Sequence, residues 1–281
     1  MLRRLLVLAA LGALVSCGGE TESAGGGGER LVSLAPSTTE LVFALGAGEL
    51  LVGRSSADDY PPASGVPVVG DFGVPNAEAL IRLKPTLVLL TGTEPDSSGR
   101  LLETLGLSTF TVRAGTLDEL VRSTLDLGQR LGRREEAASL AARLREAARA
   151  AAARAEAVGG AAPRVYVEVW HDPLTTVGRT SFVADLIRAC GGVNLFDGVE
   201  TPYFATSSEA VIAADPDVII VPGMNGVAPD VESRQGWGGI AAVRAGRVYS
   251  RIDPALLFRP GPRTVEGLKA LSKILFPEAH P

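Results

Sequence analysis

The chain carries one phrase twice, as Glu78-Ala-Leu-Ile-Arg-Leu-Lys-Pro-Thr-Leu-Val-Leu89 and as Glu209-Ala-Val-Ile-Ala-Ala-Asp-Pro-Asp-Val-Ile-Ile220. Four of the twelve positions are identical, and most of the others exchange one aliphatic residue for another. The copies start 131 residues apart (209 − 78), which is too wide a spacing and too few copies for a solenoid. The repeat therefore predicts two similar lobes, and ligand sites are often found at the interface of two such domains.

Each copy of the phrase is predicted to be a helix that leads into a strand. Asn76 is a plausible N-cap for the first helix, and Pro85 disfavours helix at Lys84. The run at residues 86–90 is one threonine followed by four aliphatic residues, and it is typical of a buried parallel strand. The helix copied at Glu209 leads in the same way into a strand at residues 218–222.

Other strands and helices alternate along both halves. In the first half, a strand at residues 31–35 is followed by a helix at residues 36–45, with serine and threonine at its start and Gly46 at its end. In the second half, a strand at residues 164–169 is followed by a helix at residues 180–190. This alternation predicts an α/β fold with two Rossmann-like lobes and a ligand cleft between them.

The segment from Arg134 to Val158 is predicted to be one long helix joining the lobes. It contains 25 residues with no glycine or proline, and a helix of that length is about 37 Å long. Large apolar residues are few in it, so we expect it to lie across a surface. The predicted divisions of the chain are a signal peptide at 1–16, a lipidated cysteine and flexible tether at 17–29, an N-terminal lobe at 30–132, the backbone helix at 133–159 and a C-terminal lobe at 160–281.

The first residues are typical of a targeting segment. Arg3 and Arg4 precede an apolar run at residues 5–15, which is too short to span a bilayer as a helix. The run ends in Leu14-Val-Ser-Cys17, which resembles the bacterial lipobox and implies lipidation of Cys17. We therefore expect an exported protein, anchored by lipid to a bacterial membrane and facing the periplasm or the cell exterior. The remaining cysteine, Cys190, would then have no disulfide partner and is expected to be buried.

Charge and missing motifs exclude several functions. The formal net charge of −5 gives no basis for binding nucleic acid. The sequence has no phosphate-binding P-loop, no Gly-x-Ser-x-Gly elbow and no His-Glu-x-x-His pair. Only two histidines are present, too few for a His-rich zinc site, so we expect no metal site, no cofactor and no enzyme activity. A surface hydrolase and an adhesive lipoprotein are the alternatives from other classes.

Several segments in order resemble the substrate-binding proteins of ABC importers for cobalamin and iron chelates, the class with a long helical backbone. The matching segments are Leu31-Val-Ser-Leu-Ala-Pro-Ser-Thr-Thr-Glu40, Ala44-Leu-Gly46, Asp59-Tyr-Pro-Pro62, Pro75-Asn-Ala-Glu78, Leu83-Lys-Pro85, Pro173-Leu-Thr-Thr-Val-Gly178, Cys190-Gly-Gly-Val-Asn194, the Glu209 phrase and Phe258-Arg-Pro-Gly-Pro-Arg263. The resemblance implies a monomer that holds a small-molecule chelate in a shallow cleft and delivers it to an ABC permease dimer.

The resemblance also implies a docking role for Glu78 and Glu209. In this family one glutamate on each lobe meets basic residues of the permease. The alternative is that each is a first-turn carboxylate that stabilises its helix by about 0.3–1 kcal/mol.

The ligand implied by the resemblance is cobalamin or a related corrinoid. A corrin is a large, mostly apolar ring fringed by amides, so flat aromatic surfaces and a few polar groups suit it. The candidate ligand-binding residues are Ser37, Thr38, Tyr60, Phe72, Trp170, Tyr203 and Arg259. Each has a structural alternative: Phe72 in the core, Tyr60 packed on the prolines that follow it, or Trp170 finishing a strand.

Departures from the cobalamin pattern leave other chelates open. Positions where cobalamin binders often place aromatic residues are Ala57, Thr91 and Leu256 here. A ferric siderophore is anionic, and a binder for it would use arginines, of which the candidates are Arg54, Arg179 and Arg259. A haem binder usually needs an axial ligand, for which Tyr60 or His171 would serve.

Overall fold

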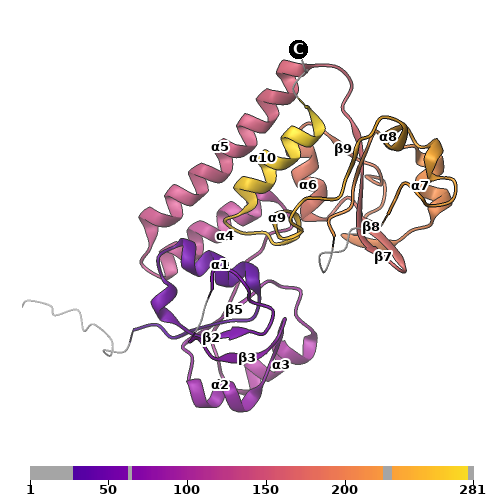
Figure 1. Cartoon of the computed structure of the whole chain (residues 1–281). Coiled ribbons are helices and arrows are strands. Elements are labelled where there is room, and N and C mark those ends of the chain that lie inside the picture. Colours follow the sequence, from indigo (N-terminus) through magenta and orange to yellow (C-terminus); the bar gives the residue numbers. More distant parts are fainter. Residues whose placement is uncertain (1–27, 63–64, 224–229, 278–281) are drawn as a thin grey trace, which may run out of the picture.

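The structure is a computed structural model that describes residues 28–62, 65–223 and 230–277. It consists of two α/β lobes joined by a layer of helices on one side (Figure 1). Cys17, the signal peptide and nearly all of the predicted tether lie outside the described residues. No helix in the part of the chain that the structure describes has the length and apolar character needed to cross a membrane.

The N-terminal lobe is built on one six-stranded sheet in the order β4-β3-β2-β1-β5-β6. Its strands are parallel except for the pair β3–β4, which is antiparallel. The strands are β1 (Leu31–Ser33), β2 (Leu51–Ser55), β3 (Val68–Asp71), β4 (Val74–Pro75), β5 (Leu87–Leu90) and β6 (Thr109–Thr111).

The C-terminal lobe has a mixed sheet in the order β10-β8-β7-β11-β12, with β9 paired to β7. The pairs of β7 with β11 and β9, and of β11 with β12, are parallel, whereas β7–β8 and β8–β10 are antiparallel. The strands are β7 (Arg164–His171), β8 (Leu174–Val177), β9 (Val193–Asn194), β10 (Tyr203–Ala205), β11 (Val218–Ile220) and β12 (Val248–Tyr249).

Helices follow most of the parallel strands, as the alternation predicted. They are α1 (Pro36–Ala44), α2 (Ala77–Leu83), α3 (Asp96–Thr104), α4 (Leu117–Arg130), α5 (Arg134–Val158), α6 (Phe182–Ala189), α7 (Ser208–Ala214), α8 (Ala241–Arg244), α9 (Ala255–Phe258) and α10 (Thr264–Leu275). The predicted α/β architecture with two lobes and one long joining helix is therefore confirmed.

The repeated phrase folds in the same way in both lobes. The side chains of Asn76 and Ser207 cap α2 and α7, accepting backbone N–H bonds of 3.0 and 3.2 Å. Both helices end at a residue in the left-handed conformation, Lys84 (φ 45°) and Asp215 (φ 43°). A proline follows each of these residues and disfavours right-handed helix at the residue before it. The strands that come next, β5 and β11, each lie one strand in from an edge of their sheet.

The start of α1 differs from the expectation of a serine or threonine cap. Its N-cap is Ala35, which has no side-chain hydrogen bond, and Pro36 occupies the first turn. Proline suits that position because its missing N–H would have no partner in the helix. The Thr38 hydroxyl instead donates back to the Ala35 carbonyl over 2.9 Å.

The long helix α5 has the predicted limits. It was expected to lie across a surface, but one of its faces is part of the core. One face is buried between α4 and α10 (Figure 1). The buried residues are small or aliphatic: Ala137, Leu140, Ala141, Leu144, Ala147 and Ala151. They belong to one hydrophobic cluster that includes Leu31 of the first sheet and Val165 of the second. The two lobes and the helical layer therefore share a continuous core.

Candidate functional site

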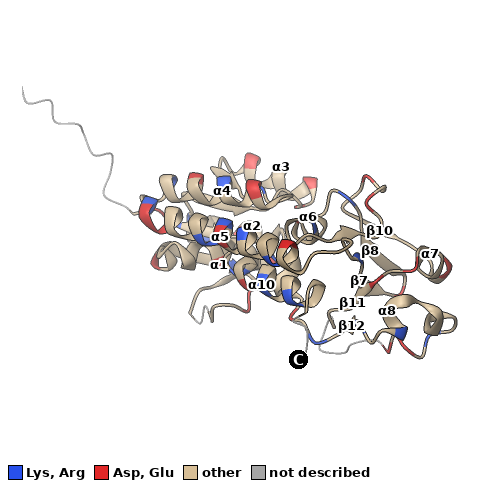
Figure 2. Ribbon diagram, turned by 90° about the horizontal axis from the view of Figure 1, so that it is seen from above, with Lys and Arg blue, Asp and Glu red and all other residues tan. Residues whose placement is uncertain are grey.

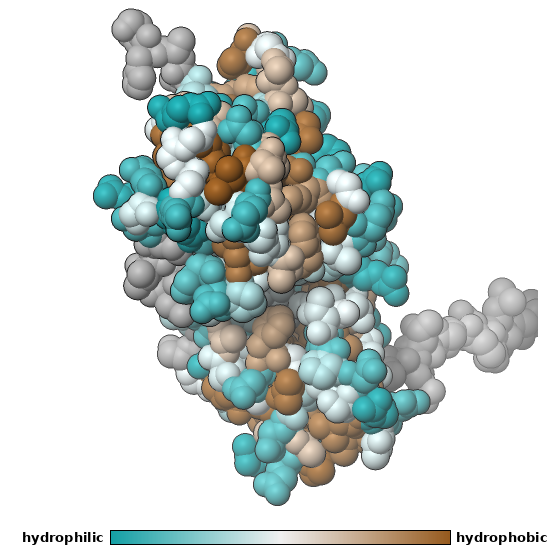
Figure 3. Space-filling view, turned by 90° about the vertical axis from the view of Figure 1, so that its right-hand side faces the viewer, coloured by the Kyte–Doolittle hydropathy of each residue, from teal (hydrophilic) through white to brown (hydrophobic). Residues whose placement is uncertain are grey.

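The carboxyl ends of the N-terminal strands point toward the second lobe. Asp59 follows β2 and contacts Arg259, which follows α9 of the C-terminal lobe. Figure 3 shows the surface hollowed between the two lobes. In open α/β sheets, ligands bind beyond the carboxyl ends of the strands, so this is the position expected of a ligand cleft.

Four large aromatic side chains are well exposed, two on each lobe. The N-terminal lobe contributes Tyr60, which is 48% exposed, and Phe72, which is 50% exposed. The C-terminal lobe contributes Trp170 at 40% and Tyr203 at 45%. A contiguous patch of exposed aromatic side chains is typical of a binding surface, whereas single exposed ones are common on protein surfaces.

The position of Phe72 excludes the alternative that this side chain is part of the hydrophobic core. It lies in the turn between β3 and β4 and is not part of the core. Trp170 is the last residue but one of strand β7, and its indole N–H donates to the Asp172 carbonyl over 2.9 Å. The Arg263 guanidinium lies 4.5 Å from the centre of the Tyr60 ring, which fixes the ring by a cation–π contact. The Tyr203 side chain is partly exposed, but desolvation of its phenol group still raises its pKa above the ordinary value.

The two polar candidates at the start of α1 are largely buried. Ser37 is 9% exposed and Thr38 is fully buried. The Thr38 hydroxyl lies 2.6 Å from the Ser33 hydroxyl in addition to its bond to the helix start. Thr38 therefore supports the turn after β1 with a hydroxyl that is not exposed, and its contact with a ligand stays a prediction.

Arg259 joins the two lobes. Both of its terminal nitrogens contact the Asp59 carboxylate, one of them over 2.9 Å. This pairing lowers the pKa of Asp59 and raises that of Arg259, and the hydrogen bond between them is the largest cause of both shifts. The residues are 200 positions apart, so no local sequence signal pointed to the pair.

A second pair lies beside the first. The Glu40 carboxylate is fully buried and accepts two bonds from Arg263, of 2.7 and 2.9 Å. Arg263 also contacts Asp253 over 3.3 Å. Glu40 is thus a partner of the opposite lobe and not a carboxylate that faces water at a helix start.

The other basic candidates are also occupied. Arg54 donates to the backbone carbonyls of Ser55 and Asp58 over 3.1 and 3.2 Å. Arg179 pairs with Glu200 over 2.8 Å on an exposed surface. His171 is exposed at the β7–β8 turn, with its ring 5.6 Å from that of Trp170.

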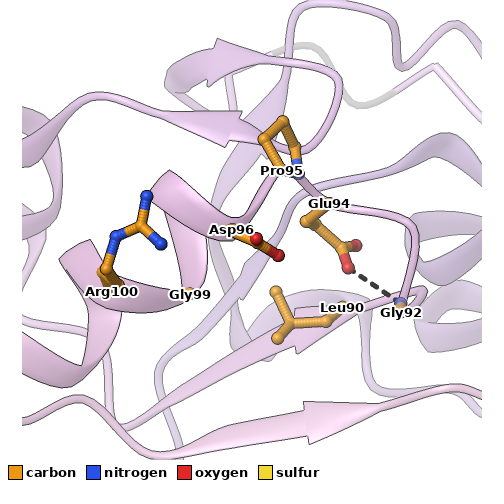
Figure 4. Close-up of a pocket in the computed structure, with 7 residues that line it drawn as sticks. All are labelled: Leu90, Gly92, Glu94, Pro95, Asp96, Gly99 and Arg100. Atoms are coloured by element: carbon orange, nitrogen blue, oxygen red, sulfur yellow. Dashed lines mark hydrogen bonds between the residues drawn. The ribbon is translucent and has the colours of Figure 1, made fainter.

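A polar pocket lies beside the end of β5 (Figure 4). It has a volume of about 370 Å³. Its lining residues are Leu90, Gly92, Glu94, Pro95, Asp96, Gly99 and Arg100. The Glu94 carboxylate accepts the backbone N–H groups of Thr91 and Gly92 over 2.5 and 2.8 Å and thereby holds the loop before α3. The sequence analysis named Thr91 in this loop, but none of the residues that line the pocket.

The two repeated glutamates lie on exposed surfaces of separate lobes. Glu78 is in the first turn of α2 and Glu209 in the first turn of α7. Figure 1 places both helices away from α5, and Figure 2 shows acidic residues on α7 at the far end of its lobe. Hydrogen bonds from its own backbone amide and from Ser207 hold the pKa of Glu209 below its ordinary value, so it is ionised at neutral pH.

Comparison with known protein families agrees with this architecture. A family model described as periplasmic binding protein matches residues 31–254. The uncharacterised ABC transporter substrate-binding lipoprotein YvrC of Bacillus subtilis is 32% identical over 258 residues, covering 89% of this chain and 81% of YvrC.

Two solved structures extend the likeness to three dimensions. The periplasmic vitamin B12 binding protein BtuF of Vibrio cholerae superposes with a TM-score of 0.76 at 28% identity, covering 88% of this chain and 96% of BtuF. The periplasmic heme-binding protein RhuT of Roseiflexus superposes with a TM-score of 0.77 at 30% identity, covering 89% of this chain and 98% of RhuT. The two structures are thus named as binding proteins for different ligands, vitamin B12 and heme.

Proposed function

The chain belongs to the periplasmic binding protein family, and from this premise we propose that it captures cobalamin or a related corrinoid outside the cytoplasm and delivers it to an ABC importer. It would act as a non-catalytic receptor. Its anchor would be a lipid on Cys17, in keeping with the name of YvrC as a lipoprotein.

The observation that carries the proposal is the pair of exposed aromatic side chains on each lobe. Tyr60 and Phe72 on one lobe, and Trp170 and Tyr203 on the other, are flat apolar side chains open to solvent, and we propose that they contact the ligand from the two lobes. A wide ring system with a neutral, amide-bearing rim fits such a site, because aromatic faces bind it without requiring charge.

Haem or a ferric siderophore is the second candidate class. Tyr60 is exposed beside the interface, and the phenol oxygen of a tyrosine is a known type of haem axial ligand. The likeness to RhuT, which is named as heme-binding, favours keeping haem in the comparison.

Calorimetric titration of the purified chain without its first 27 residues tests the ligand. We expect cyanocobalamin to bind with micromolar or tighter affinity. Haemin and a panel of ferric siderophores are titrated in parallel. If haemin or a siderophore gives a heat of binding and no corrinoid does, the protein is instead a receptor for haem or a ferric siderophore.

Docking through Glu78 and Glu209 is tested by reversing both charges. The substitutions Glu78→Arg and Glu209→Arg place cations where the permease is proposed to present its own, so we expect uptake in cells to be abolished while ligand affinity in solution is unchanged. Both side chains are exposed, so the fold should tolerate the change.

The matched control reverses two exposed carboxylates on the opposite side of the molecule. Glu136→Arg with Glu156→Arg makes the same change in net charge on α5. This variant should support uptake like the unaltered chain. Uptake that survives the reversal at Glu78 and Glu209 would remove the docking assignment.

A further inference from the structure

The arginine best placed to meet a ligand is already neutralised by the other lobe. Arg259 contacts the Asp59 carboxylate with both terminal nitrogens and lies 3.6 Å from the Glu40 carboxylate. Its side chain is about one quarter exposed (26%), whereas that of Asp59 is 64% exposed. Asp59 is therefore the more exposed member of the pair, and both terminal nitrogens of the arginine are already occupied.

The second arginine at the interface does not leave a free positive charge either. Arg263 is held by Glu40 and Asp253, and its flat face covers the Tyr60 ring. The cluster of Arg259, Arg263, Glu40, Asp59 and Asp253 thus contains two bases and three acids, a net charge of −1 (2 − 3) when all are ionised. The internal segments outside the described residues, 63–64 and 224–229, contain no lysine or arginine that would reverse this balance.

An anionic ligand would meet two costs at this cluster. It would have to displace Asp59 from Arg259 before it could use that arginine, which breaks a bond between the lobes. It would also bring a like charge toward a cluster of net charge −1 that includes the fully buried Glu40 carboxylate, where repulsion is stronger than in bulk solvent. A ligand with an uncharged, amide-bearing rim meets neither cost.

We propose that Asp59 is a specificity-determining residue that keeps Arg259 occupied, so that the cleft accepts metal chelates without net negative charge and rejects anionic ones. The proposal rests on the proposed function as a chelate receptor and narrows its substrate class. It assigns to Asp59 the discrimination against chelates that carry carboxylates or catecholates on their rims.

The test is the affinity of Asp59→Asn for ligands that differ in charge. The first pair is cyanocobalamin, which has no net charge, and its monocarboxylate derivative, in which one side-chain amide is hydrolysed. The second pair is an uncharged iron(III) tris-hydroxamate and an anionic iron(III) tris-catecholate. Asparagine keeps the shape of the side chain, removes its charge and replaces one of the two acceptor oxygens that hold Arg259 by an NH2 donor. Asp59→Ser is a second variant, which also removes the acceptor oxygens that hold Arg259.

The control variant is Glu49→Gln. Glu49 also forms an exposed ion pair with an arginine, Arg133 at the start of α5, over 2.6 Å, and neither residue belongs to the Asp59 cluster. It makes the same change in net charge without freeing Arg259. Circular dichroism and thermal melting of every variant confirm that the fold is intact before titration.

We expect Asp59→Asn to bind the anionic member of each pair at least about tenfold more tightly than the unaltered chain does, with the neutral member changed by less than about threefold. No gain for either anionic probe, or an equal gain in Glu49→Gln, would overturn the assignment. If no corrinoid binds to any variant, the corrinoid proposal fails, and the hydroxamate and catecholate pair still decides the role of Asp59.

Discussion

At the scale of single residues, Glu40 depends on a side chain 223 positions away. Its carboxylate is fully buried, and Arg263 supplies both of its short contacts. A buried charge without a partner is expensive, since the protein interior solvates it poorly. Each arginine of the cluster, in contrast, has a second carboxylate: Asp59 for Arg259 and Asp253 for Arg263.

This asymmetry predicts unequal costs for removing the two partners. Arg263→Met leaves Glu40 with only Arg259 at 3.6 Å and should lower the free energy of unfolding by about 3 kcal/mol. Glu40→Gln leaves an uncharged acceptor and two arginines that keep other carboxylates, so about 1 kcal/mol is expected. Urea denaturation of both variants measures the difference. Equal losses would show that Glu40 is not the residue stranded by the missing arginine.

At the scale of elements, the packing of α4 on α5 depends on Gly128. A methyl group at this position would lie 2.2 Å from the β-carbon of Ala137 and 2.8 Å from the Arg133 carbonyl oxygen. The two helices approach this closely because the contact residues are small. The position that helix propensity would most readily improve is therefore one that packing reserves for glycine.

Two glycine-to-alanine substitutions separate propensity from packing. Gly128→Ala should gain up to about 1 kcal/mol of helix propensity and lose more from overpacking, a net destabilisation of about 1 kcal/mol or more. Gly99→Ala in α3 has open space around the new methyl and should stabilise the chain by about 0.5–1 kcal/mol. Melting temperatures that move in the same direction would contradict this account.

At the scale of the whole molecule, the lobes are joined by more than one helix. The continuous core runs through both sheets and the helical layer. A hydrogen bond of 2.8 Å from the Leu117 amide to the Asp185 carboxylate joins α4 to α6, and the Arg259 and Arg263 pairs join the lobes at another point. Because a packed core resists continuous deformation, large hinge motion would disrupt several of these contacts at once.

We therefore expect little closure when a ligand binds. Small-angle X-ray scattering of the chain with and without saturating cyanocobalamin should give the same radius of gyration within error. A clear decrease in the radius of gyration on ligand addition would mean that the shared core rearranges and that the lobes behave as hinged domains.

The predictions from sequence succeeded where local chemistry decides the structure. The capped helix, the residue before proline and the apolar strand are each readable in the Glu78 and Glu209 phrases, and all three are present in both lobes. The limits of α5 follow in the same way from the absence of glycine and proline over residues 134–158. The lobe boundaries, the lipidation of Cys17 and the ligand contacts stay predictions.

The sequence by itself determined two lobes, their repeated helix–strand unit and the long helix between them, because these depend on propensity, capping and apolar periodicity over a few residues. Only the tertiary structure decided that Arg259 is held by Asp59, that Glu40 is paired with Arg263, and that Thr38 is buried. These pairings join residues about 200 positions apart. The charge near the ligand depends on which side chains the fold brings together. A local sequence pattern cannot predict these long-range pairs.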